Sequence, residues 1–513
     1  MFKLKGVAVL AGAAALAIAL TGCGGNASSS KSSSTSGGGT LTLGLIVAPS
    51  SFSAQNANWA NQSPYMQAVY DTLLKASPSG EIEPNLATKW SYNSDKTVLT
   101  LTLRSDVTFS DGTKFDADAA AQNLIRFRDG TSPNASTLVN LADAKAVDAT
   151  HVQLTLKAPD PAMLTYLTQN AGLQESPKAF TNKNVETVPV GSGPYRLDTA
   201  KSVTGSSYVF DKTPHYWNPS DQHYSKIVMN VYSDGTALLN AIQGGQVNAA
   251  NTFDNTTLDQ IKAAGFTVNP LELNWEGLIL GDRDGTLTPA LKNVKVRQAL
   301  EYAFDRKALL KALANGYGTL TEQIFPTSSP SFDKSLDSTY SYDPAKAKEL
   351  LAEAGYPNGF TLKMPSAAAF GESNFALIKQ QLADIGVKVT FEDLQGNDYI
   401  TALIGGKYSA ALMTLQQDPT DWQLASFQID KTAAWNGFHT DDPTVQGYIK
   451  TIQTGSEAQA TAAGKALNKY LVDQAWFVPF FRPQSSFVTD AKTKVTVQVG
   501  NAVPYLWNIT PKN

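Results

Sequence analysis

The second half of the chain alternates between amphipathic stretches and short apolar runs. Residues 344–354 (PAKAKELLAEA) place apolar side chains at helical spacing, with a proline at the start and a glycine directly after the end. The same reasoning predicts a helix within 289–313, helices at 373–385 and 399–404, and strands at 360–364, 387–392 and 409–415. Helices and strands that alternate in this way are typical of α/β units.

The first half contains more strands. Strict alternation of apolar and polar residues predicts half-buried strands at 97–103 and 151–157. A segment dense in glycine and proline follows at 188–195, where Gly191 and Gly193 permit backbone turns that other residues disfavour. The other patterns predict a turn at 111–112, strands at 41–47, 226–232 and 246–250, and helices at 65–74, 116–128 and 236–243.

The N-terminus has the features of an export signal. Two lysines precede an apolar run at 6–20, which is shorter than the roughly 20 residues of a membrane span. The run ends at Cys23, and the whole resembles a bacterial lipoprotein signal in which this cysteine is lipidated; an uncleaved anchor is the alternative. We therefore predict a signal peptide at 1–22, and a lipidated cysteine followed by a flexible Ser/Gly tether at 23–39. The protein is expected to be anchored by lipid on the extracytoplasmic face of the cell membrane.

Composition narrows the possible functions. A chain of 513 residues suggests about three domains, and a net charge of −4 makes nucleic acid an unlikely main partner. A single cysteine excludes an intramolecular disulfide and a cysteine-cluster metal site, and four histidines leave little material for a metal centre. The familiar catalytic and nucleotide-binding signatures are absent from the sequence. Together with the tether, this favours binding over catalysis and predicts neither an enzyme nor a bound cofactor.

Ten or so short motifs, in order, resemble one family. The resemblance covers nearly all of 40–513 and is to the peptide/nickel-type (family 5) extracellular solute-binding proteins of bacterial ABC importers. The motifs include 69–74 (VYDTLL), 80–90 (GEIEPNLATKW), 107–112 (VTFSDG), 190–195 (VGSGPY), 239–247 (LNAIQGGQV), 294–300 (VKVRQAL), 342–355 (YDPAKAKELLAEAG) and 477–480 (FVPF).

The resemblance implies an α/β architecture. It is a two-lobed fold of the periplasmic-binding-protein type, with a hinge and an extra third domain. Closure about the hinge would enclose a solute and create a shape that a membrane partner can recognise. The implied boundaries are lobe I at 40–58, 190–270 and 485–513, domain II at 59–189, and lobe III at 271–484.

The resemblance also implies where the solute is held. The matching segments lie after the first strand, at the start of lobe III, around an Asp-Pro loop and at the strand that crosses back. Aromatic side chains there suit peptide side chains, sugar faces or flat ligands. The implied ligand-binding residues are Phe52, Trp275, Glu276, Gln416, Gln417, Asp421, Trp422, Trp435, Asn436, Phe481 and Arg482.

One departure from the family pattern leaves the solute open. Peptide-binding members commonly place an aspartate four residues before the loop proline, where it captures the free amino terminus; here Leu415 occupies that position. The main hypothesis is capture of a peptide or similar solute and its delivery to an ABC permease whose ATPase is on another chain. An oligosaccharide or a nickel chelate is the alternative solute, and an extracellular hydrolase or a signalling receptor on this fold is the alternative function. The protein is expected to be a monomer.

Overall fold

The computed structural model describes residues 38–512, apart from the side chain of Ala369. From Gly38 onward the chain forms one compact unit. The predicted signal peptide, Cys23 and most of the tether lie outside the described residues. Within the described part, no helix is both long and apolar enough to cross a bilayer.

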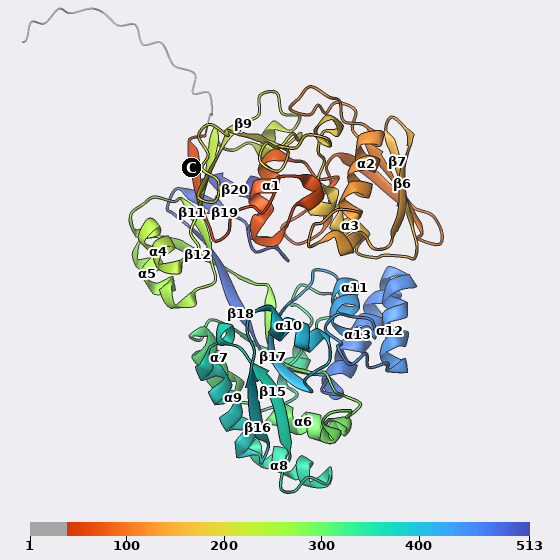
Figure 1. The fold of residues 1–513 in the computed structure, drawn as a ribbon, viewed down its shortest axis with the longest axis vertical. Coiled ribbons are helices and arrows are strands. Elements are labelled where there is room, and N and C mark those ends of the chain that lie inside the picture. The colour runs from red at the N-terminus through yellow and green to blue at the C-terminus, as the bar shows by residue number, and fades with distance from the viewer. Residues whose placement is uncertain (1–37, 513) are drawn as a thin grey trace, which may run out of the picture. The chain divides into compact units, whose positions relative to one another are not determined.

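The largest sheet among the described residues has ten strands. Its longest strand is β18 (Phe477–Thr489), whose first half pairs with β13 and whose second half pairs with β11 and β12. β18 therefore crosses the middle of the molecule, from the lower half into the upper half (Figure 1). The main order is β17 (Ala410–Gln416), β13 (Asn274–Leu280), β18, β11 (Ala249–Thr252), β1 (Thr40–Leu45), β10 (Lys226–Val231), β9 (Ser207–Lys212) and β8 (Tyr195–Leu197), while β12 (Thr267–Glu272) and β14 (Gly318–Leu320) pair with β18 beside it.

A second, antiparallel sheet lies in the segment before Gly191. Its order is β4 (Ala87–Tyr92), β5 (Val98–Leu103), β7 (His151–Leu156) and β6 (Leu141–Asp148). Alternate residues of β5 and β7 are buried, as the sequence pattern predicts. They pack with α2 (Ala117–Arg128), which begins where the Asp116 carboxylate accepts a hydrogen bond from Ala119 N–H. We call this cluster the β4–β7 core.

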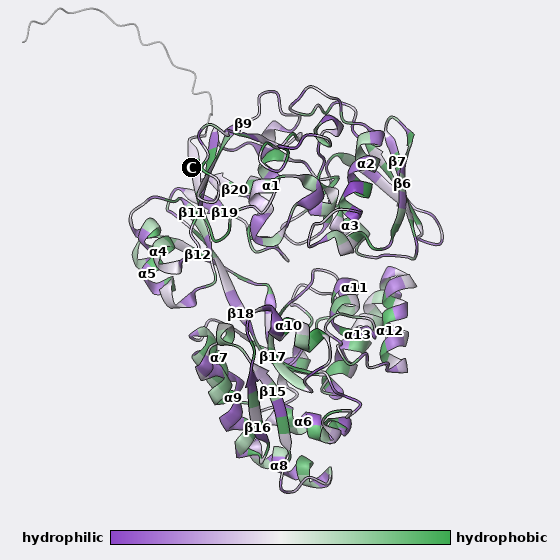
Figure 2. Cartoon of the chain, viewed as in Figure 1, coloured by the Kyte–Doolittle hydropathy of each residue, from purple (hydrophilic) through white to green (hydrophobic). Residues whose placement is uncertain are grey.

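The segment after Leu273 supplies two further cores. One surrounds the parallel pair β15 (Thr361–Ser366) and β16 (Lys388–Asp393), and we call it the β15–β16 core. The other lies on the opposite face of β13 and β17 and is called the α10–α13 core. α12 shows how it forms, since Val445, Ile449 and Ile452 make one buried face on an otherwise polar helix (Figure 2). The helices are α6 (Val294–Tyr302), α7 (Arg306–Ala314), α8 (Pro344–Glu353), α9 (Glu372–Asp384), α10 (Asn397–Ile404), α11 (Asp421–Leu424), α12 (Pro443–Thr454) and α13 (Glu457–Asp473).

Smaller elements complete the fold. They are α1 (Ser63–Val69), α3 (Met163–Tyr166), α4 (Gly235–Gln243), α5 (Leu258–Ala263) and the strand pairs β2 (Leu74–Ala76) with β3 (Ile82–Pro84) and β19 (Thr493–Val495) with β20 (Ile509–Pro511).

One predicted helix is shorter than expected, and one segment predicted to contain a helix contains two. The helix predicted at 65–74 ends at Val69, because Tyr70 is extended and its hydroxyl donates to the Phe52 carbonyl oxygen at 2.7 Å. The helix predicted within 289–313 is two helices, and the second begins where the Asp305 side chain accepts from Ala308 N–H.

The sequence analysis explained Gly191 and Gly193 by unusual backbone turns, and the structure gives a different explanation. Neither has a positive φ. Instead, a Cβ on Gly191 would lie 2.0 Å from the Val69 carbonyl oxygen and one on Gly193 would lie 2.5 Å from Tyr70 N. These glycines are needed because the backbone passes close to the end of α1.

Candidate functional site

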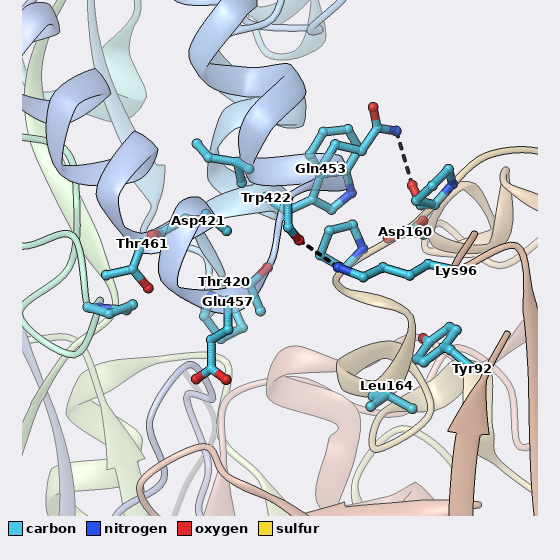
Figure 3. Close-up of a pocket in the computed structure, with 17 residues that line it drawn as sticks. Tyr92, Lys96, Asp160, Leu164, Thr420, Asp421, Trp422, Gln453, Glu457 and Thr461 are labelled. Carbon is cyan, nitrogen blue, oxygen red and sulfur yellow. Dashed lines mark hydrogen bonds between the residues drawn. The ribbon is translucent and has the colours of Figure 1, made fainter. Parts of the chain in front are cut away.

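A cavity of about 410 Å³ lies between the β4–β7 core and the α10–α13 core, and we call it the distal cavity. One wall comes from the segments around Tyr92, Asp160 and Leu164, and the other from α11, α12 and the start of α13 (Figure 3). Two of the predicted ligand-binding residues, Asp421 and Trp422, line it. Its volume falls in the usual range for small-molecule sites.

Trp422 joins the two walls. Its half-buried ring packs against residues of both the β4–β7 core and the α10–α13 core. Thr420 fixes its position by accepting a hydrogen bond from Gln423 N–H at 3.2 Å, which starts α11. Across the cavity, burial raises the pKa of Asp160, although hydrogen bonds from Asn140 and Ala162 favour its charged form.

Asp421, in α11, binds the loop that contains Ser329 and Ser331, and Gly464 of α13 lies beside this contact. Its carboxylate accepts hydrogen bonds from Ser329 Oγ at 2.5 Å and from Ser331 Oγ. Gly464 makes this possible, because a Cβ there would lie 2.1 Å from Ser331 Oγ and 2.8 Å from Asp421 Oδ2. Burial raises the pKa of Asp421. Its hydrogen bonds show that Asp421 shapes the wall of the distal cavity.

Two hydrogen bonds join the walls of the distal cavity. Lys96 Nζ donates to the Gly455 carbonyl oxygen at 2.6 Å, and Gln453 Nε2 donates to the Pro159 carbonyl oxygen at 3.0 Å (Figure 3). Gly455 follows the last turn of α12, so the lysine charge lies at the negative end of the helix dipole.

A second cavity of about 430 Å³ lies beside β12 and β18, and we call it the hinge cavity. Its lining includes Glu272, Thr319, Gln417, Gln484 and Gln498, so polar side chains from distant segments meet there. Gln417 is a predicted ligand-binding residue. It is almost fully buried, its Nε2 donates to the Ile324 carbonyl oxygen at 3.0 Å, and its Oε1 has no hydrogen-bond partner among the described residues.

Five of the predicted ligand-binding residues lie in protein cores and line neither cavity. Trp275 is fully buried, with its indole Nε1 donating to Gln428 Oε1 at 3.0 Å. Arg482 is also fully buried, with Nη2 donating to the Phe325 carbonyl oxygen at 3.3 Å. Phe52 packs on Tyr65 and Tyr208, Phe481 belongs to the β15–β16 core, and Asn436 bonds to the Ile429, Asp430 and Thr440 carbonyl oxygens. These contacts give all five a structural role, and ligand contact by them stays a prediction.

The three remaining predicted ligand-binding residues are Glu276, Gln416 and Trp435. Glu276 accepts a hydrogen bond from Thr414 Oγ1 at 3.2 Å, and burial raises its pKa to about 7. Gln416 is exposed at the end of β17. Trp435 borders only a small cavity of about 20 Å³. None of these three lines the distal cavity or the hinge cavity.

The sequence analysis did not predict one of the two walls of the distal cavity. It assigned no ligand contact to residues 59–189, yet Tyr92, Lys96, Asp160 and Leu164 line the distal cavity. The only local signal is the proline-rich stretch at 158–161 (APDP), which does not distinguish a cavity wall from an ordinary loop.

Comparison with known proteins identifies the family. The family model described as "Bacterial extracellular solute-binding proteins, family 5 Middle" matches residues 81–436, well over half of the chain. The chain belongs to this family. Family 5 proteins are substrate-binding components of ABC importers and act as carriers, not enzymes.

Individual relatives agree with this assignment. The chain is 27% identical over 470 residues to the glutathione-binding protein GsiB of Escherichia coli K12, which covers 85% of this chain and 90% of that protein. HbpA2 of Haemophilus parasuis has a TM-score of 0.81 at 21% identity, covering 92% of this chain and all of that one. The periplasmic binding protein DppA of Helicobacter pylori, solved with the peptide STSA, has a TM-score of 0.72 at 21% identity, covering 93% and 98%. The predicted α/β, two-lobed family 5 fold is confirmed.

Proposed function

We propose that this family 5 protein captures a short peptide or peptide-like solute between its lobes and delivers it to an ABC permease. The observation that carries the proposal is the distal cavity, whose two walls belong to different cores and meet at Trp422. A solute held there would contact both walls at once. A bound solute would therefore favour one arrangement of the two cores, and a membrane partner could recognise that arrangement.

The relatives support a peptide-like solute. GsiB is named for glutathione, itself a tripeptide, and DppA was solved with a tetrapeptide. The boundaries that we propose are those of the sequence analysis: lobe I at 40–58, 190–270 and 485–513, domain II at 59–189, and lobe III at 271–484. The proposal also includes a signal peptide at 1–22, lipidation of Cys23 and a tether through residue 39, with the folded part on the extracytoplasmic face.

Native mass spectrometry of the purified protein, before and after denaturation, tests this function. A series of released peptide masses is the expected result. A released saccharide or metal chelate would contradict the peptide assignment and leave the carrier assignment in place. If the protein is purified empty, a thermal-shift screen across peptides, sugars and nickel chelates follows, and stabilisation by sugars or chelates alone would also contradict it.

A further inference from the structure

The distal cavity and the hinge cavity are successive compartments along the same two segments. The loop at 326–330 contributes Pro326 to the hinge cavity and Pro330 to the distal cavity. The segment at 417–422, which runs into α11, does the same, with Gln417 in the hinge cavity and Trp422 in the distal cavity. The two cavities therefore lie next to each other along these segments.

Pro419 and Gly500 separate the compartments. Pro419 lines the distal cavity and Gly500 lines the hinge cavity. A Cβ on Gly500 would lie 3.2 Å from Pro419 Cβ, and Gly500 has a φ of +72°, which side chains disfavour. Pro419 and Gly500 therefore lie close together at the boundary between the two compartments.

The distal compartment offers apolar surface. Four prolines (Pro159, Pro161, Pro330 and Pro419) line it together with Tyr92, Leu164, Trp422 and Ile452. Its main polar groups already have protein partners, since Lys96 donates to Gly455, Asp160 accepts from Asn140, and Asp421 accepts from two serines. Glu457 is exposed at the start of α13. The lining that is free to meet a solute is therefore mostly hydrocarbon and aromatic.

The hinge compartment offers hydrogen bonds. Three glutamines, two threonines (Thr319 and Thr327), Ser328 and Glu272 line it. Some of these groups also have protein partners, since Thr319 donates to Glu272, Gln484 to Ser486 and Gln498 to the Ser77 carbonyl oxygen. The lining still carries more polar side chains than that of the distal compartment. Gln417 Oε1 is buried, has no partner among the described residues and has almost no accessible surface. An amide N–H or a hydroxyl on the solute therefore meets the other polar side chains of this lining, such as Thr327 and Ser328.

We propose that the cleft selects an elongated solute with segregated chemistry, in which an amide- or hydroxyl-bearing end occupies the hinge compartment and an apolar end occupies the distal compartment. The inference rests on the proposed function and refines it. It predicts that affinity depends on having both ends in one molecule.

Two matched tetrapeptides test the inference by isothermal titration calorimetry on the full chain: Gln-Gly-Gly-Phe and Gln-Gly-Gly-Ser. The phenylalanine peptide should bind at least tenfold more tightly, a difference of about 1.4 kcal/mol. Equal affinity would overturn the two-compartment inference while leaving peptide capture intact. Failure of both peptides to bind would overturn both the inference and the peptide assignment.

Variants then locate the apolar end. Leu164→Ser should reduce the preference for phenylalanine about tenfold. Thr165→Ala, on the neighbouring residue of α3 that does not line the cavity, is the matched control and should keep the preference. Tyr92→Ser, at a half-buried residue of the same wall, provides a second variant with the same expected loss should Leu164→Ser fail to fold. A phenylalanine preference that survives in a folded variant of either kind would overturn the placement.

Discussion

Lys96 Nζ donates a hydrogen bond of 2.6 Å to the carbonyl oxygen of Gly455, a residue 359 positions further along the chain. The bond ties a turn beside the β4–β7 core to the end of α12. It satisfies a helix carbonyl that has no partner within its own helix, and it places a positive charge at the negative end of the dipole.

Removal of this bond should loosen the end of α12. For Lys96→Ala we expect amide hydrogens in the last turn of α12 to exchange about two- to fivefold faster, since such a bond contributes about 0.5–1 kcal/mol. Hydrogen exchange with mass spectrometry measures this. Lys450→Ala, at an exposed position on the same helix, is the control, and equal acceleration in both variants would contradict the role of the bond.

Gly464 should be intolerant of a methyl group. An alanine there collides with Ser331 Oγ and crowds Asp421, so Gly464→Ala is expected to destabilise the protein by about 1–3 kcal/mol. Gly447 is also helical but has open space around its Cβ position, so Gly447→Ala should stabilise by up to about 1 kcal/mol. Thermal melting of the two variants should therefore shift in opposite directions, and a fall of both would contradict this packing argument.

Stability should decline as the pH rises toward neutrality. Burial raises the pKa of both Glu276 and Asp418 to about 7, so between about pH 4.5 and 7 the folded protein binds more protons than the unfolded chain. The stabilisation is full below the unfolded pKa and is lost as the pH passes through about 7. Glu276→Gln removes one of the two groups and keeps an acceptor for Thr414.

The free energy of unfolding of Glu276→Gln should equal that of the wild type near pH 4. Above pH 7 it should be larger by about 1–2 kcal/mol, a figure reduced because Glu276 is partly exposed. Urea unfolding across this pH range measures the difference. Glu457→Gln, at an exposed position, should show no such divergence. A constant offset between Glu276→Gln and the wild type at every pH would rule out this linkage.

Leu415→Asp should not restore the amine-binding aspartate of related peptide carriers. Leu415 is buried in the α10–α13 core, so a carboxylate there has no water to solvate it. We expect a loss of at least about 3 kcal/mol in the free energy of unfolding and no gain in affinity for peptides with a free amino terminus. Leu415→Met, which preserves the apolar volume, should cost less than about 1.5 kcal/mol. A folded Leu415→Asp protein that binds peptides more tightly would disprove this.

Cys23→Ser should release the protein from the membrane. If Cys23 carries the lipid, the variant will move from the membrane fraction to the soluble fraction, because the lipid chains supply the anchoring. Immunoblotting of the two fractions is the measurement. Ser28→Ala, within the tether, should leave the wild-type distribution unchanged, and retention of Cys23→Ser in the membrane fraction would favour the uncleaved anchor.

Local signals in the sequence predicted most elements, and they worked where a single residue or period decides the structure. α8 begins at Pro344 and ends just before Gly355, and β5 and β7 follow their strict alternation. The end of the helix predicted at 65–74 was wrong, because it depends on contacts of Tyr70 with distant residues.

Site prediction was limited for the same physical reason. Aromatic residues in a core and in a cavity look alike in sequence, and only packing shows that Trp275 is enclosed while Trp422 lies between two cores. Lys96 had no signal at all, because its hydrogen-bond partner Gly455 lies 359 residues away, and the proline-rich stretch around Asp160 does not show that the opposite wall comes from α11 to α13.

The pairing of β18 also sets an order of events during synthesis. β11 and β12 find their partner in residues 484–489, so these strands have an open edge until almost the whole chain has left the ribosome. The sheet that contains β1, the first strand, therefore cannot be completed early. A chain that must pass through a secretion channel before it folds gains from this delay, because its topology keeps it incompletely folded until its last segment is available.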